Sequence, residues 1–537
     1  MATDPTPQRH YRAACPNCGA PVDFRSAASA SAVCSFCRST LLREGDALRR
    51  IGQSAELFDD HSPLQLGASG RYQGAAFTLV GRLQYGYADG TWNEWHALFD
   101  SGGVQKSAWL SEDNGAYVLS FEAPLSGEVP TAEELSAGER RLVAGLAWDV
   151  ASVTRVKLLA AQGELPHPPN QGSEFVVADL RNERAEVGTL DYADPAQPTW
   201  SVGRAVALSE LAMAGLAEGT EKTLKGRSAE CPSCGTSLQI TLDSTQSIVC
   251  QQCHAVVDLS QGVGADLKHY AQAANTSEPL LPLGSTGVLT LGKLGPLPWA
   301  VVGYMERCDV PGGSGEGDSE QTFWREYLLY NQRAGFAFLV DAEDGWSWVR
   351  PLTGTPTGSG DRLQFEGDSY QKRYSYPAKV SYVLGEFYWR VTRDQRSLNT
   401  DYQGQGSAAR KQLNREETGN EVTWSAGEKL DASTIARAFK LPDDRLAALE
   451  RDAAPTGLGD LGDVLGSAGG LLKPLLIFGL LVIVIIAVTR CGSDDCDAYR
   501  DTYGPDSAEY KQCQRGGGTR TSGGSYGGFS SGGGGHK

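Results

Sequence analysis

The chain has 537 residues, of which 40% are hydrophobic and 21% charged, and its formal net charge is −17. It is too long for one ordinary domain, and its acidic surface argues against broad binding to DNA or RNA, because polyanions repel it. Residues 1–30 are polar and alanine-rich and lack the apolar core of a secretory signal, so we expect the N-terminal domains to stay in the cytosol.

The first predicted element is a small metal-binding ribbon at residues 11–45. The stretch "CPNCGAPVDFRSAASASAVCSFCR" holds two Cys-x-x-Cys pairs, with fifteen residues between the inner cysteines. In a reducing compartment such clusters are typical of metal sites rather than disulfides. Four thiolates close a tetrahedral shell around zinc and leave no open position for water, so a structural ion is favoured. The spacing therefore predicts Zn²⁺ bound by Cys15, Cys18, Cys34 and Cys37, with Gly19 in a tight turn.

A β-rich domain is predicted after this ribbon, over residues 62–217. The stretch "FTLVGRLQY" alternates with a period of two, which is typical of a strand. The stretch "TAEELSAG" has capping-box spacing and predicts a short helix or turn at Thr131. The pattern does not separate a sandwich from a barrel. We expect one strand face to carry Phe77, Leu79, Leu83 and Tyr85, and the other Thr78, Arg82 and Gln84.

The same arrangement then recurs about two hundred residues later. The stretch "CPSCGTSLQITLDSTQSIVCQQCH" repeats the cysteine spacing, "QTFWREYLLYN" resembles the earlier "GTWNEWHALFD", and "TWSAG" resembles "TWSVG". We therefore predict a second ribbon at 228–262 and a second β-rich domain at 279–443. The second structural Zn²⁺ is assigned to Cys231, Cys234, Cys250 and Cys253.

The C-x-x-C-H ending of the second ribbon also matches a haem attachment site, but three observations exclude that interpretation. His254 has no counterpart in the first copy, where Arg38 follows the last cysteine. The other cysteine pair would have no role, and no export signal takes the segment to where such haems are attached. A redox dithiol is less compatible still, since it uses one cysteine pair.

Two pairs of glutamates recur in the β-rich domains. Glu94 and Glu326 lie between aromatic residues, and Glu164 and Glu386 each follow a glycine. A carboxylate beside aromatic rings can have a raised pKa and act as a general acid. The structural alternative, an aromatic ladder with glutamates facing water or pairing with arginine, is favoured because nothing completes a catalytic set. His96 aligns with Leu328, so the copies share no catalytic histidine.

The order L-G-x-x-G, an aromatic W-x-E strand, G-E and W-S-x-G resembles the bacterial domain of unknown function 4178 family over 62–217 and 279–443. The resemblance implies β-rich domains that are often paired with zinc ribbons or a transmembrane segment, and it points to envelope physiology without an established activity. The second copy departs by a longer loop, "DVPGGSGEGDS". We also expect Trp92 to lack an aligned tryptophan there.

The C-terminal part predicts a membrane anchor. After a glycine-rich linker at 444–470, residues 471–489 approach the roughly 20 apolar residues that span a bilayer. Lys473 and Arg490 flank the segment and do not fix its orientation. Because the ribbons need reducing conditions, we expect the N-terminal domains inside and the tail at 490–537 outside. That tail is too poor in apolar residues to pack, and it contains Cys491, Cys496 and Cys513.

We therefore expect a mainly β bacterial protein that crosses the cell membrane once and acts as a non-enzymatic scaffold or sensor adaptor for a protein partner. Two tethered modules would raise the effective concentration at that partner. An enzyme with a cleft around Glu94 or Glu326 is the alternative. Nucleic-acid binding through the arginine-rich first ribbon is a third, disfavoured because the second ribbon has no such excess. The partner, the ligand and the oligomeric state stay open.

Overall fold

In the computed structural model of the chain, strands form nearly all of the regular structure, as the alternating sequence pattern predicts. The predicted span at 471–489, the tail at 490–537 and most of the predicted linker lie outside the residues that the structure describes. Those residues are 11–25, 29–44, 47–54, 62–88, 91–101, 104–113, 116–170, 173–217, 227–242, 245–259, 267–272, 278–310, 322–331, 334–392 and 395–451.

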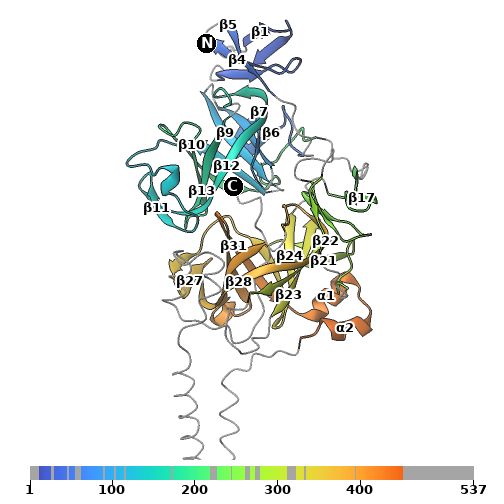
Figure 1. The fold of residues 1–537 in the computed structure, drawn as a ribbon. Helices are drawn as coiled ribbons and strands as arrows, with labels where there is room; N and C mark the ends of the chain where they lie inside the picture. The colour runs from blue at the N-terminus through green and yellow to red at the C-terminus, as the bar shows by residue number, and fades with distance from the viewer. Residues whose placement is uncertain are drawn as a thin grey trace, which may run out of the picture.

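Each cysteine-rich segment folds into short antiparallel strands. The first ribbon lies at the top of Figure 1 and consists of β1 (Tyr11–Ala14), β2 (Pro21–Phe24), β3 (Ser31–Val33), β4 (Ser39–Glu44) and β5 (Ala47–Gln53). The second consists of β16 (Arg227–Glu230), β17 (Ser237–Ile240), β18 (Ser247–Val249), β19 (Val256–Asp258) and β20 (His269–Tyr270).

The first β-rich domain is a closed antiparallel barrel rather than a sandwich. Its strand β7 pairs with β8 on one side and with β12 on the other, so the sheet has no free edge at this point. Around the barrel the order is β7 (Ala75–Gly86), β8 (Thr91–Ser101), β9 (Val104–Asp113), β10 (Ala116–Glu122), β15 (Thr199–Val206), β14 (Glu186–Asp191), β13 (Glu174–Arg181) and β12 (Leu146–Leu165).

The second domain repeats this barrel strand for strand. Here β22 pairs with both β23 and β28 and closes the sheet in the same way. The order is β22 (Pro296–Asp309), β23 (Phe323–Asn331), β24 (Gly335–Ala342), β25 (Gly345–Pro351), β31 (Glu421–Leu430), β30 (Lys411–Thr418), β29 (Arg396–Gly404) and β28 (Asp368–Phe387).

Short hairpin strands and turns extend both barrels. The predicted turn at Thr131 is a 3₁₀ turn, η1 (Ala132–Glu134), in which the Thr131 backbone N–H donates to Glu134 Oε2 at 2.8 Å. The remaining elements are β6 (Ser69–Tyr72), β11 (Arg140–Val143), β21 (Thr286–Thr290), β26 (Thr357–Ser359), β27 (Arg362–Phe365) and η2 (Gly406–Ala408).

The predicted alternation along β7 is wrong in its second half because the strand contains a bulge at Val80. The register to β8 shifts between Leu79 and Gly81, so Leu79 lies opposite Ala97 while Leu83 lies opposite Glu94. One extra residue reverses the faces of all that follow it. The expected common face of Phe77, Leu79, Leu83 and Tyr85 is therefore split.

Two short helices end the described chain and pack against the second barrel. Helix α1 (Ala432–Phe439) buries Ile435 and Phe439 in the same apolar cluster as Trp299, and α2 (Asp443–Leu449) follows it. Trp346 Nε1 donates to Leu449 O at 2.8 Å. The folded part of the second module therefore reaches into the range assigned to the linker.

Within the described ranges, the structure has no helix with the length and apolarity needed to cross a membrane.

The two modules contact each other where β12 of the first meets β31 of the second. Ser152 pairs with Glu421, and the Val153 N–H donates to Asn420 O at 3.2 Å. Thr355 Oγ1 also donates to Asp149 Oδ2 at 3.0 Å. Figure 1 shows the first barrel above the second at this junction. The two modules are thus joined by direct contacts as well as by the chain segment that connects them.

Candidate metal centres and recurring glutamates

The first ribbon brings its four cysteines together in one cluster. The sulfur atoms of Cys15, Cys18, Cys34 and Cys37 all lie within 4.8 Å of one another. The closest pairs are Cys15–Cys37 at 3.6 Å and Cys18–Cys34 at 3.7 Å. A disulfide would need about 2.05 Å, whereas sulfurs about 2.3 Å from a central tetrahedral ion lie about 3.8 Å apart. The group fits a metal ion with four thiolate ligands.

The second ribbon repeats this cluster with the four predicted residues, Cys231, Cys234, Cys250 and Cys253. Its sulfur separations are 3.6 Å for Cys231–Cys253 and 3.6 Å for Cys234–Cys250. In both ribbons two of the four cysteines are buried and one is exposed. The repeated spacing in the sequence therefore corresponds to a repeated geometry.

The backbone around each cysteine pair forms the same kind of turn. This turn requires a left-handed backbone conformation at the residue that follows the pair. The Gly19 N–H donates to Cys15 O at 2.8 Å, and Gly19 has a left-handed backbone with φ of 77°. The residues after the other pairs do the same, with φ of 57° at Arg38 and 56° at His254. His254 is therefore the counterpart of Arg38 as a turn residue, in agreement with the rejection of a haem site.

A hydroxyl group lies beside one sulfur of each cluster. Ser39 Oγ is 3.2 Å from Cys37 Sγ, and Thr236 Oγ1 is 3.3 Å from Cys234 Sγ. These hydroxyls are the first cause that lowers the pKa of Cys37 to about 5 and that of Cys234 to about 6. A donor beside the sulfur stabilises the thiolate, the form that binds metals.

Glu164 and Glu386 attach each ribbon to its barrel. The Arg25 N–H donates to Glu164 Oε2 at 2.8 Å. At the matching position, the Thr241 N–H donates to Glu386 Oε1 at 2.9 Å, and the Leu242 N–H donates to Oε2 at 3.0 Å. The ribbon strands β3 and β18 also pair with the barrel strands at these glutamates. Buried carboxylates that accept backbone N–H groups hold a loop in place.

The glycine before each of these glutamates is required by the same junction. Gly163 and Gly385 have φ of 72° and 86°. A Cβ atom on Gly163 would lie 2.2 Å from Val80 O, and one on Gly385 would lie 2.3 Å from Val302 O. The recurring Gly-Glu pair thus allows the long strand to approach its neighbour and to present the carboxylate to the ribbon.

Glu94 and Glu326 are buried inside the protein. Their exposures are 7% and 1%. Trp92 Nε1 donates to Glu94 Oε1 at 3.1 Å, and Trp324 Nε1 donates to Glu326 Oε1 at 2.7 Å. The expectation that Trp92 lacks an aligned tryptophan is therefore wrong, because Trp324 occupies its position. These carboxylates are buried acceptors of indole N–H groups.

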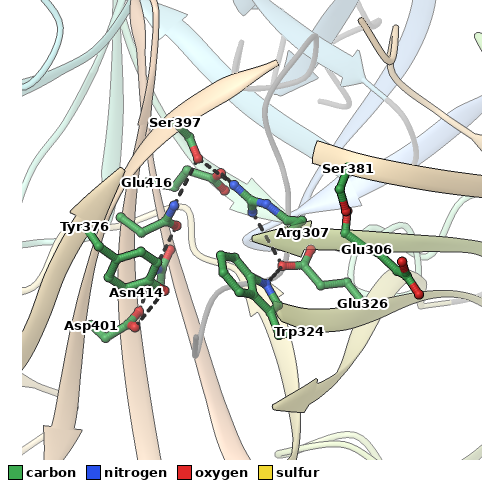
Figure 2. A network of polar contacts seen from close by, with 11 residues as sticks. Glu306, Arg307, Trp324, Glu326, Tyr376, Ser381, Ser397, Asp401, Asn414 and Glu416 are labelled. Atoms are coloured by element: carbon green, nitrogen blue, oxygen red, sulfur yellow. Dashed lines mark hydrogen bonds and ion pairs between the residues drawn. The ribbon is translucent and has the colours of Figure 1, made fainter. Parts of the chain in front are cut away.

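A buried polar network extends from Glu326 across the second barrel (Figure 2). Arg307, which is 0% exposed, donates to Glu326 Oε1 at 3.4 Å and to Glu416 Oε1 at 2.8 Å. Because β22 and β30 are separated by β28 and β29, this contact crosses the barrel interior. Burial opposes the charge of Arg307, but Glu416 and Glu326 outweigh it and raise its pKa above the ordinary value.

The network continues through Arg307 Nη2, which donates to Ser397 Oγ at 2.5 Å. Asn399 Nδ2 donates to the same hydroxyl at 2.9 Å, and Asn414 Nδ2 donates to Asp401 Oδ1 at 2.8 Å. Tyr376 ends the network as a donor to Asp401 Oδ2 at 2.9 Å. Figure 2 shows these side chains pointing toward one another. Sequence analysis of each copy alone missed this network.

The first barrel keeps polar residues at several of the corresponding positions, including Asp179 for Asp401 and Asp191 for Glu416, but it lacks the central arginine. Tyr85 pairs with Trp92 as Arg307 pairs with Trp324, so the arginine replaces a tyrosine. A residue-by-residue comparison of the copies would have revealed this polar substitution. The register along β12–β13 and β28–β29 further matches Phe175 with Ser397, Val177 with Asn399, and Thr154 with Tyr376.

Some arginines of the first ribbon are already used within the ribbon. Arg12 Nε lies 3.2 Å from Asp23 Oδ1, and the Arg43 guanidinium lies 4.4 Å from the Tyr11 ring centroid. Arg50 Nη2 donates to Gln53 Oε1 at 3.3 Å. These contacts weaken the case for a continuous nucleic-acid surface on this ribbon.

Comparison with known families identifies the barrels. A family model described as "Domain of unknown function (DUF4178)" matches residues 65–208 and 290–432, together more than half of the chain. No curated protein and no solved structure matched. The two matches fall on the two barrels, as the sequence resemblance predicts.

Proposed function

The chain belongs to the domain of unknown function 4178 family, with two copies of the domain, and from this premise we propose that it is a membrane-held, non-enzymatic scaffold or adaptor that binds a protein partner. One observation carries the proposal. The glutamates that recur in both copies are buried and have structural partners, which are the ribbon backbone for Glu164 and Glu386 and an indole N–H for Glu94 and Glu326. The repeated residues thus maintain two rigid modules rather than perform a reaction.

We assign one structural zinc ion to each ribbon. Thiolate ligands suit zinc, and four of them leave no coordination position for water or substrate. Each ribbon is too small to have a large core of its own, so the ion would contribute to its folding directly. The metal site would then keep each ribbon in the conformation whose backbone N–H groups donate to Glu164 or Glu386.

The partner surface includes the tip of the first ribbon. Phe36 lies between the cysteines of the second pair and is 72% exposed, and Ile51 on β5 is also exposed. The matching position in the second ribbon is Gln252. Exposed aromatic side chains serve as anchors in protein interfaces, which are enriched in them. The tip of one ribbon is thus equipped for contact and that of the other is not.

Residues 471–489 would hold the modules at the membrane. This segment is apolar and long enough to span a bilayer, and residues 452–470 separate it from the last described residue. Reduced thiolates favour the cytosolic side for both ribbons. In this arrangement the tail with Cys491, Cys496 and Cys513 faces outward.

Topology is tested on intact cells that express the full chain. A membrane-impermeant maleimide is added after mild reduction, and labelled cysteines are identified by mass spectrometry. Cys491, Cys496 and Cys513 should be labelled, while the ribbon cysteines and Cys308 should not be. Labelling of the ribbon cysteines in unbroken cells would show the opposite orientation. Extraction of the chain from membranes by carbonate would contradict a transmembrane anchor.

Partner binding is tested by crosslinking in native membranes followed by purification of the full chain. The variant Phe36→Gln introduces the residue that the second ribbon already holds, and Phe323→Gln, at a residue 53% exposed on the second barrel, is the matched control. A specific partner should be captured by wild type and by the Phe323 variant, with a loss of about tenfold for Phe36→Gln. Capture of the same background proteins by all three chains would count against an adaptor.

A further inference from the structure

A pocket of about 300 Å³ lies where the two modules meet. Its walls come from β11, β12 and β13 of the first module and from residues 352–363, β30 and β31 of the second. Ligand pockets occur preferentially at such domain interfaces, and the volume is at the small end of their usual range. Neither module alone forms this pocket.

Close contacts hold the two walls of the pocket together. The Thr355–Asp149 hydrogen bond and the Val153–Asn420 hydrogen bond lie beside it. Two glycines lie at this contact, and a Cβ on Gly138 would lie 3.3 Å from Val422 Cγ2. The second, Gly354, would place its Cβ 3.2 Å from Ala185. The pocket is therefore part of a close-packed interface.

The pocket lining is positively charged. Its charged residues are Arg140, Arg181, Arg415 and Asp149, three arginines against one aspartate, which gives a net charge of +2. Arg140 donates to Asp149 Oδ1 at 2.9 Å and to Glu183 Oε1 at 3.0 Å, and Arg415 forms an ion pair with Glu417. Carboxylates thus fix the orientation of two arginines, and Glu183 and Glu417, which lie outside the lining, offset its positive charge.

Arg181 is the most deeply buried cation of the lining, with an exposure of 7%, and its Nη1 donates to Leu180 O at 3.2 Å. Burial lowers its pKa, and the charges of Asp179 and Glu421 do not offset that effect. Arg307 behaves in the opposite way, because its two glutamates outweigh burial. Arg181 is therefore a buried cation at the wall of the pocket.

Trp424 gives the pocket a flat apolar wall. Its counterpart in the first module, Trp200, is 2% exposed and packs edge-on against Trp148 at 5.2 Å. Trp424 is only half-buried and lines the pocket. The residue paired with each tryptophan differs as well, being Leu190 for Trp200 and Arg415 for Trp424. The second module thus offers an accessible indole beside a guanidinium where the first has a closed apolar core.

We propose that this inter-module pocket binds a small organic anion, with its carboxylate or phosphate group at Arg181 and Arg415 and its planar apolar part against Trp424. Guanidinium groups recognise both head groups through paired N–H donors, and the indole favours a flat ring over a hydrated ion. The site is independent of the partner and membrane proposals above.

The test measures binding of defined probes to the detergent-purified full chain by calorimetry. The probes are phenyl phosphate and benzoate, with inorganic phosphate and phenol as controls for the head group and the ring. At least one of the first two should bind at least about tenfold more tightly than either control. Whichever of the two binds more tightly identifies the head group.

Two variants locate the binding. Arg181→Gln introduces the residue present at the matching position of the second module, Gln403. It should weaken the anionic aromatic probes about tenfold or more, whereas Arg204→Gln, outside the pocket on β15, should change their affinity less than about twofold. Trp424→Leu should remove the advantage of phenyl phosphate over inorganic phosphate, and it remains informative if Arg181→Gln fails to fold.

Three results would overturn the proposal. They are the absence of saturable binding for both anionic aromatic probes up to about 10 mM, equal losses in the Arg181 and Arg204 variants, and an unchanged probe preference in Trp424→Leu.

Discussion

Burial changes what individual residues contribute, and His96 shows this most clearly. The imidazole is 0% exposed, and its nitrogens lie 2.8 Å from Glu164 O and 2.9 Å from Ser107 Oγ. Burial is the main cause that lowers the pKa of His96 to about 4. The side chain is a neutral part of the junction between β8 and β12, not a proton-transfer group.

The depressed pKa of His96 predicts a pH dependence of stability. Between pH 6.5 and 4 the His96 imidazole is protonated in the unfolded chain but not in the folded protein. Stability therefore falls as the pH falls through this window. From pH 7 to pH 5 the His96 side chain should lower the free energy of unfolding by about 2 kcal/mol. Urea unfolding of the first barrel at both pH values, for wild type and His96→Leu, measures it.

His96→Leu introduces the residue that the second barrel has at this position, Leu328. The variant should show a smaller loss between pH 7 and pH 5 by that amount, whatever its stability at pH 7. An identical pH dependence in both proteins would contradict the assignment.

Arg307 is the residue on which the buried network of the second barrel depends. Arg307→Met should leave Glu326 and Glu416 buried without their cation, which should destabilise the second module by about 3–5 kcal/mol. Arg410→Met in the same module is the control, because Arg410 and Asp431 of its ion pair are 55% and 69% exposed, and such a pair should contribute about 0–1 kcal/mol. Urea unfolding followed by tryptophan fluorescence measures both variants. Similar losses in the two would show that the network is not a special source of stability.

At the scale of elements, the long strands β12 and β28 join each ribbon to its barrel. Each strand pairs with the ribbon, with its neighbouring barrel strand and with the hairpin that follows it. At Gly163–Glu164 and at Gly385–Glu386 the long strand also pairs with the ribbon, and the left-handed glycine makes this close approach possible. Ribbon and barrel are therefore joined by strand pairing as well as by the chain.

The glycine requirement at this junction can be measured with a matched pair. Gly385 and Gly367 have the same φ of 86°, but only Gly385 has a carbonyl 2.3 Å from the added Cβ, while Gly367 has nothing within 4 Å. Gly367→Ala should cost about 1 kcal/mol for the backbone conformation alone. Gly385→Ala should cost several times more and should detach the second ribbon, measured as faster hydrogen exchange at 241–249. Equal costs would mean that the carbonyl contact is easily relieved.

Metal content tests the ribbons themselves. The purified full chain should contain two zinc ions, and Cys34→Ser should reduce this to one, because three thiolates and a hydroxyl bind zinc much more weakly. Cys308→Ser, at a buried cysteine outside both clusters, should keep two ions. Elemental analysis by mass spectrometry gives the ratio. Full zinc content in Cys34→Ser, or none in wild type, would contradict the assignment.

At the scale of the whole molecule, duplication and divergence act together. Both modules keep the barrel, the ribbon and their junction. They differ in the buried network, in the residue at the ribbon tip and in the exposure of the tryptophan at the interface. Two copies placed face to face create a pocket and a composite surface that one copy does not have.

The inter-module contact predicts the effect of a single bulky residue. Gly354→Leu should push the modules apart, because a Cβ there already lies 3.2 Å from Ala185. Hydrogen exchange should become faster in peptides covering 149–155 and 420–424, while the rest of each barrel stays protected. Gly295→Leu, at a glycine with nothing within 4 Å, is the control and should change neither region. Unchanged exchange in Gly354→Leu would mean that this contact does not hold the modules.

The two ribbons, the eight clustered cysteines, the duplication and the β class could all be predicted from local patterns, because cysteine spacing and alternating hydrophobicity are local properties. The choice between barrel and sandwich, the junction role of Glu164 and Glu386, and the contact of Arg307 with Glu416 became visible only in the folded chain. Sheet closure and buried partners depend on residues about a hundred positions apart, which no local pattern encodes. The bulge at Val80 was also not predictable from the local pattern. One unpaired residue there reversed the strand faces predicted after it.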